Sequence, residues 1–222
     1  MPRTKMRRYD VLTIFPEMIA SYAKESILGR AQEKKLIEVT GYDLRQWAED
    51  KHRKVDDTPY GGGPGMVMKV EPIEKAVKKV RGRNKNTRVI VTSASGKTFT
   101  QRDAERLAQY SQVIIICGRY EGIDARVEEH VADEAFSIGN YVLTGGELPA
   151  LVMVDAIARH IPGVLGAQES LEEESHGEDG LLEYPQYTKP AVYKKWSVPE
   201  VLMSGDHKKI SVWRKENQKK PL

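Results

Sequence analysis

The chain has 222 residues, of which 40% are hydrophobic and 30% charged, so it can bury a core and wholesale disorder is excluded. Its formal net charge of +3 permits a nucleic-acid partner without requiring one. A single cysteine, Cys117, excludes a disulfide framework and a cysteine-rich zinc site, and favours a reducing compartment. No apolar run approaches the roughly 20 residues of a membrane span. We therefore expect a soluble, cytoplasmic protein.

Strand-like and helix-like patterns alternate through the first two-thirds of the chain. In chain order they predict a strand at 11–15, a helix at 17–34, a strand at 36–44, a helix at 71–80, a strand at 89–91, a helix at 102–110, a strand at 113–117, and helices at 123–131 and 148–161. Strands that alternate with helices pair in parallel through crossovers, which predicts an α/β domain with a parallel sheet.

The character of the sequence changes after Gly163. Residues 168–180 are acidic and poor in apolar side chains, which is typical of a linker or mobile loop. The basic stretch beyond residue 181 contains one predicted helix, at 206–218. We expect an α/β domain over 1–162, an acidic linker over 163–180 and a small helical region over 181–222.

Three glycine-rich segments, 60–66, 117–124 and 137–149, lie between or after these elements. Glycine lets a ligand come close to the backbone, and ligands of open α/β sheets bind beyond the carboxyl ends of the strands. The segments therefore favour a binding site lined by main chain over a set of plain tight turns. None has the dinucleotide pattern G-x-G-x-x-G, and Ser95–Thr98 lacks the first glycine of a phosphate-binding loop.

Charged residues inside the glycine-rich segments have two open interpretations. Arg119, Glu121, Asp124 and Glu147 could face a ligand, or they could cap neighbouring helices, as the places of Asp124 and Glu147 near helix starts suggest. Cys117 ends an apolar strand, which favours a small buried side chain over a nucleophile. The five histidines lack the spacing of a metal site.

Several segments together resemble the bacterial tRNA (guanine-N1)-methyltransferases, in that family's order: 52–66, 117–124, 137–143, 145–149, 161–166 and 180–190. The resemblance extends from Arg8 to about Trp213. It implies a knotted (SPOUT) methyltransferase, in which an α/β domain ends in a deep C-terminal trefoil knot, and an obligate homodimer with each site built from both chains. The implied reaction moves a methyl group from S-adenosylmethionine to N1 of the guanosine immediately 3′ of the anticodon (guanosine-37) in tRNA. The family also uses Mg²⁺, for which this sequence shows no site.

The resemblance also implies roles for individual residues. The methyl-donor pocket corresponds to Gly118, Tyr120, Glu121, Gly122, Ile138, Gly139, Asn140, Tyr141, Val142, Leu143, Gly145, Gly146 and Pro149. The guanine-binding loop corresponds to Tyr60, Gly61, Gly62, Gly63, Pro64, Gly65 and Met66.

The general base of the family is an aspartate in the acidic loop, and its cation is an arginine that matches Arg159. Alignment on Ser170 and Ser175 places Glu174 at the position of the aspartate, so Glu174 is the predicted base. Glu172, Glu173 and Asp179 are alternatives. Asn140 also departs from the family, where many relatives have aspartate.

Two other functions remain open from the sequence. One is an RNA-binding member of the same fold without catalysis, suggested by the change of the catalytic aspartate to glutamate. The other is a related knotted methyltransferase acting on ribosomal RNA or a ribose hydroxyl, against which the loop 60–66 argues. Family members usually continue with further basic residues beyond the position of Leu222, which predicts weaker tRNA binding and a shallower salt dependence here.

Overall fold

The structure, a computed structural model, describes residues 6–166 and 182–219. The chain forms two compact units, residues 1–166 and 167–222. Glu174, its alternatives Glu172, Glu173 and Asp179, and most of the predicted linker lie outside the described residues.

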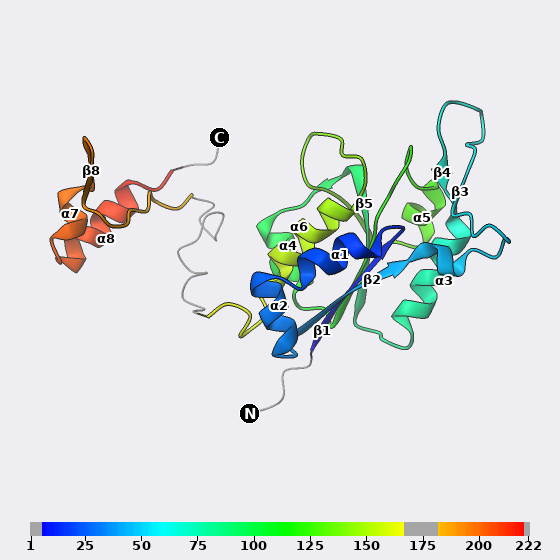
Figure 1. The fold of residues 1–222 in the computed structure, drawn as a ribbon, viewed down its shortest axis with the longest axis horizontal. Helices are drawn as coiled ribbons and strands as arrows, with labels where there is room; N and C mark the ends of the chain where they lie inside the picture. The colour runs from blue at the N-terminus through cyan, green and yellow to red at the C-terminus, as the bar shows by residue number, and fades with distance from the viewer. Residues whose placement is uncertain (1–5, 167–181, 220–222) are drawn as a thin grey trace. The chain divides into compact units, whose positions relative to one another are not determined.

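A five-stranded parallel sheet forms the centre of the first unit (Figure 1). Its strands are β1 (Arg7–Thr13), β2 (Ile37–Asp43), β5 (Thr87–Thr98), β6 (Gln112–Ile116) and β7 (Glu134–Ser137). They lie in the order β2-β1-β6-β5-β7, and every neighbouring pair is parallel. The predicted α/β class with a parallel sheet is confirmed.

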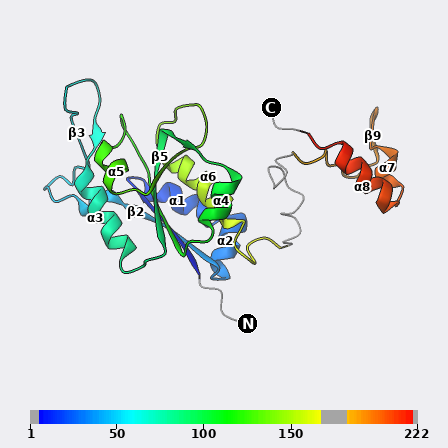
Figure 2. The ribbon, with the colours of Figure 1, turned by 180° about the vertical axis from the view of Figure 1, so that it is seen from behind.

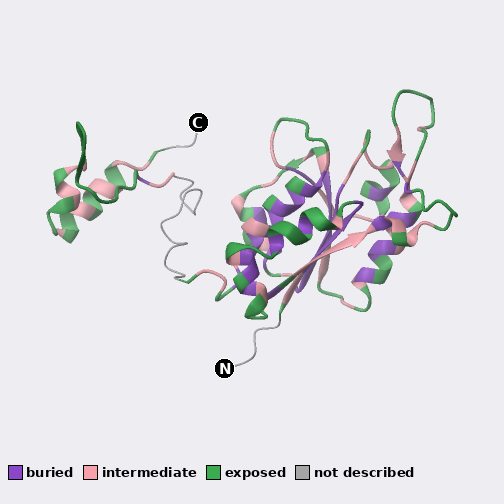
Figure 3. Cartoon of the chain, in the orientation of Figure 1, coloured by how far each residue is buried: buried purple, intermediate pink, exposed green. Residues whose placement is uncertain are grey.

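Helices cover both faces of this sheet (Figures 1 and 2). One face packs against α1 (Pro16–Ala23), α2 (Ser26–Glu33), α4 (Gln101–Leu107) and α6 (Glu147–Ala158), and the other against α3 (Val70–Arg81) and α5 (Ala125–His130). Strand β6 is buried throughout, because Val113 and Ile115 join the first core and Ile114 and Ile116 join the second. Figure 3 shows buried residues where the helices face the sheet.

The predicted helix at 17–34 is wrong in one respect, because it consists of two helices. The backbone turns at Glu25 and Ser26, where Ser26 has φ 49°. A Cβ on Gly29 would lie 2.2 Å from the carbonyl oxygen of Lys24. Glycine therefore allows α2 to pack closely on the end of α1, which a continuous helix would not do.

Several short elements were not predicted. They are strand β7, the 3₁₀ helix η1 (Leu44–Trp47) and the antiparallel ribbon of β3 (Asp56–Asp57) and β4 (Val67–Met68). Strand β5 also runs beyond the predicted 89–91, and its pairing with β7 shifts register between Thr92 and Lys97. These segments are too short or too polar to show a hydrophobic period.

The second unit contains the hairpin β8 (Val192–Tyr193) and β9 (Trp196–Ser197), followed by α7 (Glu200–Met203) and α8 (His207–Glu216). Helix α8 confirms the predicted helix at 206–218. It begins at Asp206, whose carboxylate accepts hydrogen bonds from the backbone N–H groups of Lys208 and Lys209. The Trp213 ring packs against Tyr184 and Tyr187, with centroids 6.4 and 6.3 Å apart.

Candidate active site

A cavity of about 350 Å³ lies at the carboxyl ends of β5, β6 and β7. Its lining comprises Val91, Thr92, Ser93, Ala94, Ser95, Gly118, Arg119, Tyr120, Glu121, Gly122, Ile123, Asp124, Ala125, Glu128, Phe136, Ser137, Ile138, Tyr141, Val142, Leu143, Thr144, Gly145, Gly146 and Pro149. Every residue predicted for the methyl-donor pocket is in this lining except Gly139 and Asn140, which belong to the same loop. The structure thus brings two of the three glycine-rich segments together around one space.

The loop before α6 packs against β5 and the end of β6 at one side of the cavity. The backbone N–H of Gly146 donates to the carbonyl of Gly118 at 2.9 Å, and the hydroxyl of Thr92 donates to the carbonyl of Ile116 at 3.2 Å. A Cβ on Gly146 would lie 2.0 Å from Thr92 Oγ1 and 2.8 Å from the nitrogen of Gly118. Only glycine therefore fits at position 146, between the ends of β5 and β6.

The cavity suits a small ligand held largely by main chain. Gly122 has φ +134°, and a Cβ on it would meet no protein atom within 4 Å, so this wall presents bare backbone. Tyr141, Val142 and Leu143 expose apolar side chains along the opposite loop. The volume falls within the roughly 300–1,000 Å³ typical of small-molecule sites.

Two titratable side chains near this site, Tyr120 and Cys117, have raised pKa values. Burial, together with the nearby Asp56 carboxylate, raises the pKa of the Tyr120 phenol. Burial, reinforced by the charge of Glu147, raises the pKa of the Cys117 thiol well above its ordinary value. Because a thiolate is needed for nucleophilic chemistry, Cys117 is a buried structural residue, as the sequence indicated.

The predicted guanine-binding loop lies beside the cavity and outside its lining. It spans residues 58–66 between β3 and β4. The backbone N–H of Glu121 donates to the carbonyl of Met66 at 3.0 Å, and a Cβ on Gly65 would lie 2.4 Å from Glu121 Cγ. At the far end of the loop, Tyr60 is fully exposed. The loop is therefore joined to the cavity wall at Glu121.

The charged residues of the glycine-rich segments, which could either face a ligand or cap a helix, have different roles in the structure. Asp124 caps α5, since its carboxylate accepts the backbone N–H of Arg126 at 3.0 Å. Hydrogen bonding from the Arg126 side chain lowers the pKa of that carboxylate. Glu121 lines the cavity, whereas Glu147 does not cap its helix and instead forms a buried ion pair with Arg119.

Arg159 lies away from the cavity within its own chain. It follows the last residue of α6, whose first turn borders the cavity at Pro149. The ten residues from Pro149 to Arg159, at about 1.5 Å each, separate the two by about 15 Å along the helix. The structure therefore does not bring Arg159 to the donor pocket of the same subunit.

The sequence analysis missed the contribution of β5. Residues 91–95 line the cavity, yet only 89–91 had a strand-like pattern, because Ser93 to Gly96 are small or polar. Their place in the sequence could have indicated this role, because they directly follow a predicted buried strand and ligands of parallel sheets bind beyond the carboxyl ends of the strands.

Within residues 6–166 and 182–219, no three His, Cys, Asp or Glu side chains are grouped so as to hold a metal ion. No helix in these ranges has the length and apolar character needed to cross a membrane.

The fold and the cavity define an α/β protein with a small-molecule site at the carboxyl edge of a parallel sheet. The model of the family "tRNA (Guanine-1)-methyltransferase TrmD" matches residues 6–221, and the chain belongs to this family.

Curated relatives carry the name tRNA (guanine-N(1)-)-methyltransferase. The protein from Citrifermentans bemidjiense is 51% identical over 95% of this chain and 84% of its own length. That from Thermomicrobium roseum is 54% identical over 94% of this chain and 77% of its own length. That from Dictyoglomus turgidum is 53% identical over 95% of this chain and 84% of its own length.

Proposed function

We propose that this protein transfers a methyl group from S-adenosylmethionine to N1 of guanosine-37, immediately 3′ of the anticodon in tRNA. The observation that carries the proposal is the cavity at the sheet edge, whose glycine-rich walls fit a small donor in a chain of this family. Its cytoplasmic location is part of the same proposal, because the substrate is tRNA.

The glycine-rich loops would hold the donor and align it. S-adenosylmethionine supplies an already activated methyl group when bound. The chain's own task is then chiefly positioning, to which proximity and orientation can contribute about 7–11 kcal/mol. Residues 118–122 and 141–146 would hold the donor through main chain, while the apolar side chains of Tyr141, Val142 and Leu143 would exclude water.

The acceptor nitrogen needs a base. Guanine N1 carries a proton and becomes a good nucleophile only when the proton leaves, so a carboxylate must stand within hydrogen-bond reach. We assign this role to Glu174, which lies outside the described residues. Loss of the proton places negative charge on guanine O6, and the guanidinium of Arg159 would stabilise that charge. The N1 atom is on the pairing edge, so the base must be flipped out of its stack.

A homodimer would bring these groups together. Arg159 lies about 15 Å along α6 from Pro149, which lines the cavity of its own chain. Helices α1 and α6 also expose an apolar face, formed by Met18 and Tyr22 on α1 and Leu148 and Val152 on α6. The two helices are linked by a hydrogen bond of 2.6 Å from Tyr22 to Asp155. Two-fold packing of this face would run the α6 helices past each other, with Arg159 of one chain near the cavity of its partner.

A trefoil knot is consistent with the path of the chain. Beyond β7 at one edge of the sheet, the chain returns through residues 138–146 against the end of β6, and then enters α6 on the face covered by α1. We propose that this return threads through the loop preceding it. An experimental electron-density map in which residues 138–158 pass outside that loop would contradict the knot.

The second unit would contact the tRNA backbone. Helix α8 and the following segment expose Lys208, Lys209, Lys215 and Lys219. Lysine contacts to phosphates are independent of sequence and weaken with salt. Removing residues 208–222 should therefore lower tRNA affinity and flatten its salt dependence. The family's Mg²⁺ has no site among the described residues, and no step above depends on it.

The proposal is tested by methyl incorporation. The protein is incubated with methyl-labelled S-adenosylmethionine and unmodified tRNA transcripts that carry either G or A at the position after the anticodon. Incorporation with G and none with A is expected. Binding of tRNA without incorporation would indicate an RNA-binding protein, and incorporation into both transcripts would exclude N1 of this guanosine as the acceptor.

A single substitution tests the proposed base. Glu174→Gln keeps the size of the side chain but cannot accept the proton, so kcat should fall by at least about 100-fold, the scale of general base catalysis. The Kd for the donor, measured by calorimetry, should stay unchanged. Glu173→Gln is the matched control, and retained turnover in Glu174→Gln would move the base to another residue.

A further inference from the structure

Arg119 is part of the cavity lining, and its guanidinium makes several contacts with protein groups. Nε donates to Glu147 at 2.9 Å, and a terminal nitrogen donates to the carbonyl of Thr144 at 3.1 Å. The group also lies over the ring of Phe15, 4.7 Å from the centroid. The Arg119 side chain is only 18% exposed and that of Glu147 only 1%.

Glu147 also contacts the end of β1. Its second carboxylate oxygen accepts the hydroxyl of Thr13 at 2.7 Å, and the Thr13 oxygen in turn accepts the backbone N–H of Phe15 at 2.9 Å. One set of contacts therefore joins the end of β1, the loop after β6 and the first turn of α6. A Cβ on Gly145 would lie 2.2 Å from Arg119 Nε, so the loop before α6 packs directly on this arginine.

A need for stability does not by itself account for a buried pair of this kind. Taking both charges out of water carries a large desolvation penalty, and apolar residues of similar volume often stabilise a fold as well. The pair fixes the relative positions of the groups that it joins, because charge-assisted hydrogen bonds are short and have a well-defined geometry. The atoms that it fixes belong to Thr144, Gly145 and Gly146, which are part of the cavity wall.

We propose that Arg119 and Glu147 are positioning residues for the methyl donor: they hold the loop 144–146 in the shape that the donor requires. The inference rests on the proposed function of the cavity as the donor site. Arg119 lines the cavity, and it holds the loop through its contacts with Glu147 and Thr144.

The test is donor affinity in the absence of tRNA. Calorimetric titration of the full chain with S-adenosylmethionine gives Kd for the wild type, Glu147→Gln and Thr13→Val. Glu147→Gln weakens a charge-assisted hydrogen bond and should raise Kd about tenfold. Thr13→Val removes one bond to the carboxylate and should raise Kd less. At saturating donor, kcat should change by less than about twofold, because the reacting groups are intact.

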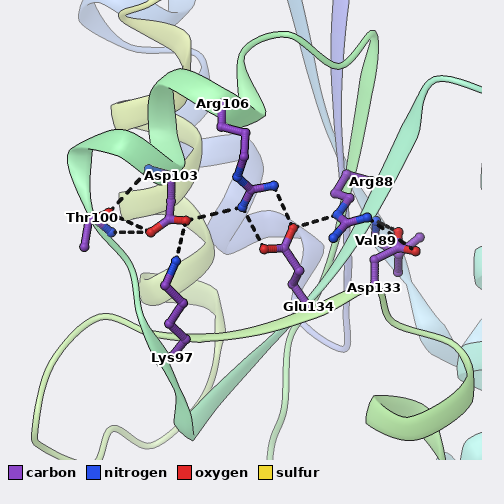
Figure 4. Close-up of polar contacts among 8 residues, drawn as sticks. All are labelled: Arg88, Val89, Lys97, Thr100, Asp103, Arg106, Asp133 and Glu134. Carbon is purple, nitrogen blue, oxygen red and sulfur yellow. Dashed lines mark hydrogen bonds and ion pairs between the residues drawn. The ribbon is translucent and has the colours of Figure 1, made fainter.

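Asp103→Asn is the matched control. Asp103 is likewise a buried carboxylate in the first turn of a helix, where it accepts a threonine hydroxyl from Thr100 at 2.7 Å and an arginine N–H from Arg106 at 3.3 Å (Figure 4). It does not line the cavity. Its substitution should lower the free energy of unfolding and leave the donor Kd unchanged.

The outcomes separate the two proposals. If Glu147→Gln and Thr13→Val lower stability as Asp103→Asn does but keep the wild-type Kd, the pair is structural only and the inference is overturned. Thr13→Val alone decides the matter if Glu147→Gln does not fold. If the wild-type protein does not bind S-adenosylmethionine, the proposed function itself fails.

Discussion

The reactivity of the single residue Cys117 tests whether the strand end beside the cavity is closed to solvent. It directly precedes Gly118, it is fully buried, and burial raises the pKa of its thiol. We expect a thiol-reactive disulfide reagent to label the native protein far more slowly than the chain unfolded in guanidinium chloride. Because Cys117 is the only cysteine in the sequence, the absorbance of the released thiol measures it alone. Equal labelling rates in the two states would show that the strand end is open.

Asp103 gives the stability a pH dependence of known sign. Burial opposes its ionisation, but hydrogen bonds from Thr100, Lys97 and Arg106 outweigh this effect and lower the pKa of its carboxyl (Figure 4). A carboxyl whose pKa is lower in the folded state stabilises the protein above its unfolded pKa of about 3.9, and that stabilisation is lost as the pH falls through the folded value. Asp103→Asn should therefore flatten the loss of stability below about pH 4.

The contribution of Asp10 to stability depends on pH in the opposite direction. Burial raises the pKa of its carboxyl despite hydrogen bonds from Gln112 and Arg8. Its contribution to stability is therefore present below about pH 3.9 and lost as the pH rises through the folded pKa. Urea unfolding of Asp10→Asn and Asp103→Asn across this range should give differences from the wild type of opposite slope. Equal slopes would contradict the assignment for Asp103.

At the scale of elements, the closest approach in the site is that of α6 to the ends of β5 and β6. A methyl group at position 146 would overlap Thr92 Oγ1 and crowd the backbone of Gly118. Gly146→Ala must therefore push α6 away from the strand ends, and donor affinity should fall by at least about tenfold. Gly166→Ala, where an added Cβ meets nothing within 4 Å, is the control. Calorimetric titration measures both, and unchanged binding in Gly146→Ala would exclude this packing.

The elements that could be predicted are those with a hydrophobic period. Strand β6 and helix α6 are apolar enough to be identified from sequence, and both are buried as expected. Strand β7 and the ribbon β3–β4 could not be predicted, because two to four residues show no period. The single helix expected at 17–34 is interrupted at Glu25 and Ser26, and the close approach of Gly29 to the backbone of Lys24 depends on a contact that the hydrophobic period does not show.

The site could be predicted in part. The donor pocket at 118–149 came from its glycine-rich segments and from the resemblance to a family, and the cavity brings nearly all of those residues together. The role of residues 91–95 and the pairing of Arg119 with Glu147 depend on contacts between distant segments, which no sequence spacing encodes. The assignment of Glu174 remains a prediction.

At the scale of the whole molecule, the proposed sharing of the site between subunits rests on the length of one helix. The cavity borders the first turn of α6 and Arg159 follows its last turn, so the proposed donor pocket and the proposed cation are at opposite ends of one helix. The exposed apolar face on α1 and α6 is the surface on which we propose that a second copy packs. In the proposed dimer, the cavity and Arg159 of one site come from different chains.

Subunit mixing tests this arrangement. Gly146→Ala weakens donor binding and Arg159→Ala removes the cation, so at a donor concentration well below the Kd of the Gly146→Ala variant each variant alone should show little methyl transfer. If the site is shared, a mixed dimer contains one complete site, formed by the cavity of the Arg159→Ala chain and Arg159 of the Gly146→Ala chain. Random mixing of equal amounts, by unfolding and refolding together, makes about half of the dimers mixed and should restore about a quarter of the wild-type activity. Complementation requires that Arg159 acts across the interface; if both groups acted within one chain, the mixture would stay as inactive as its components.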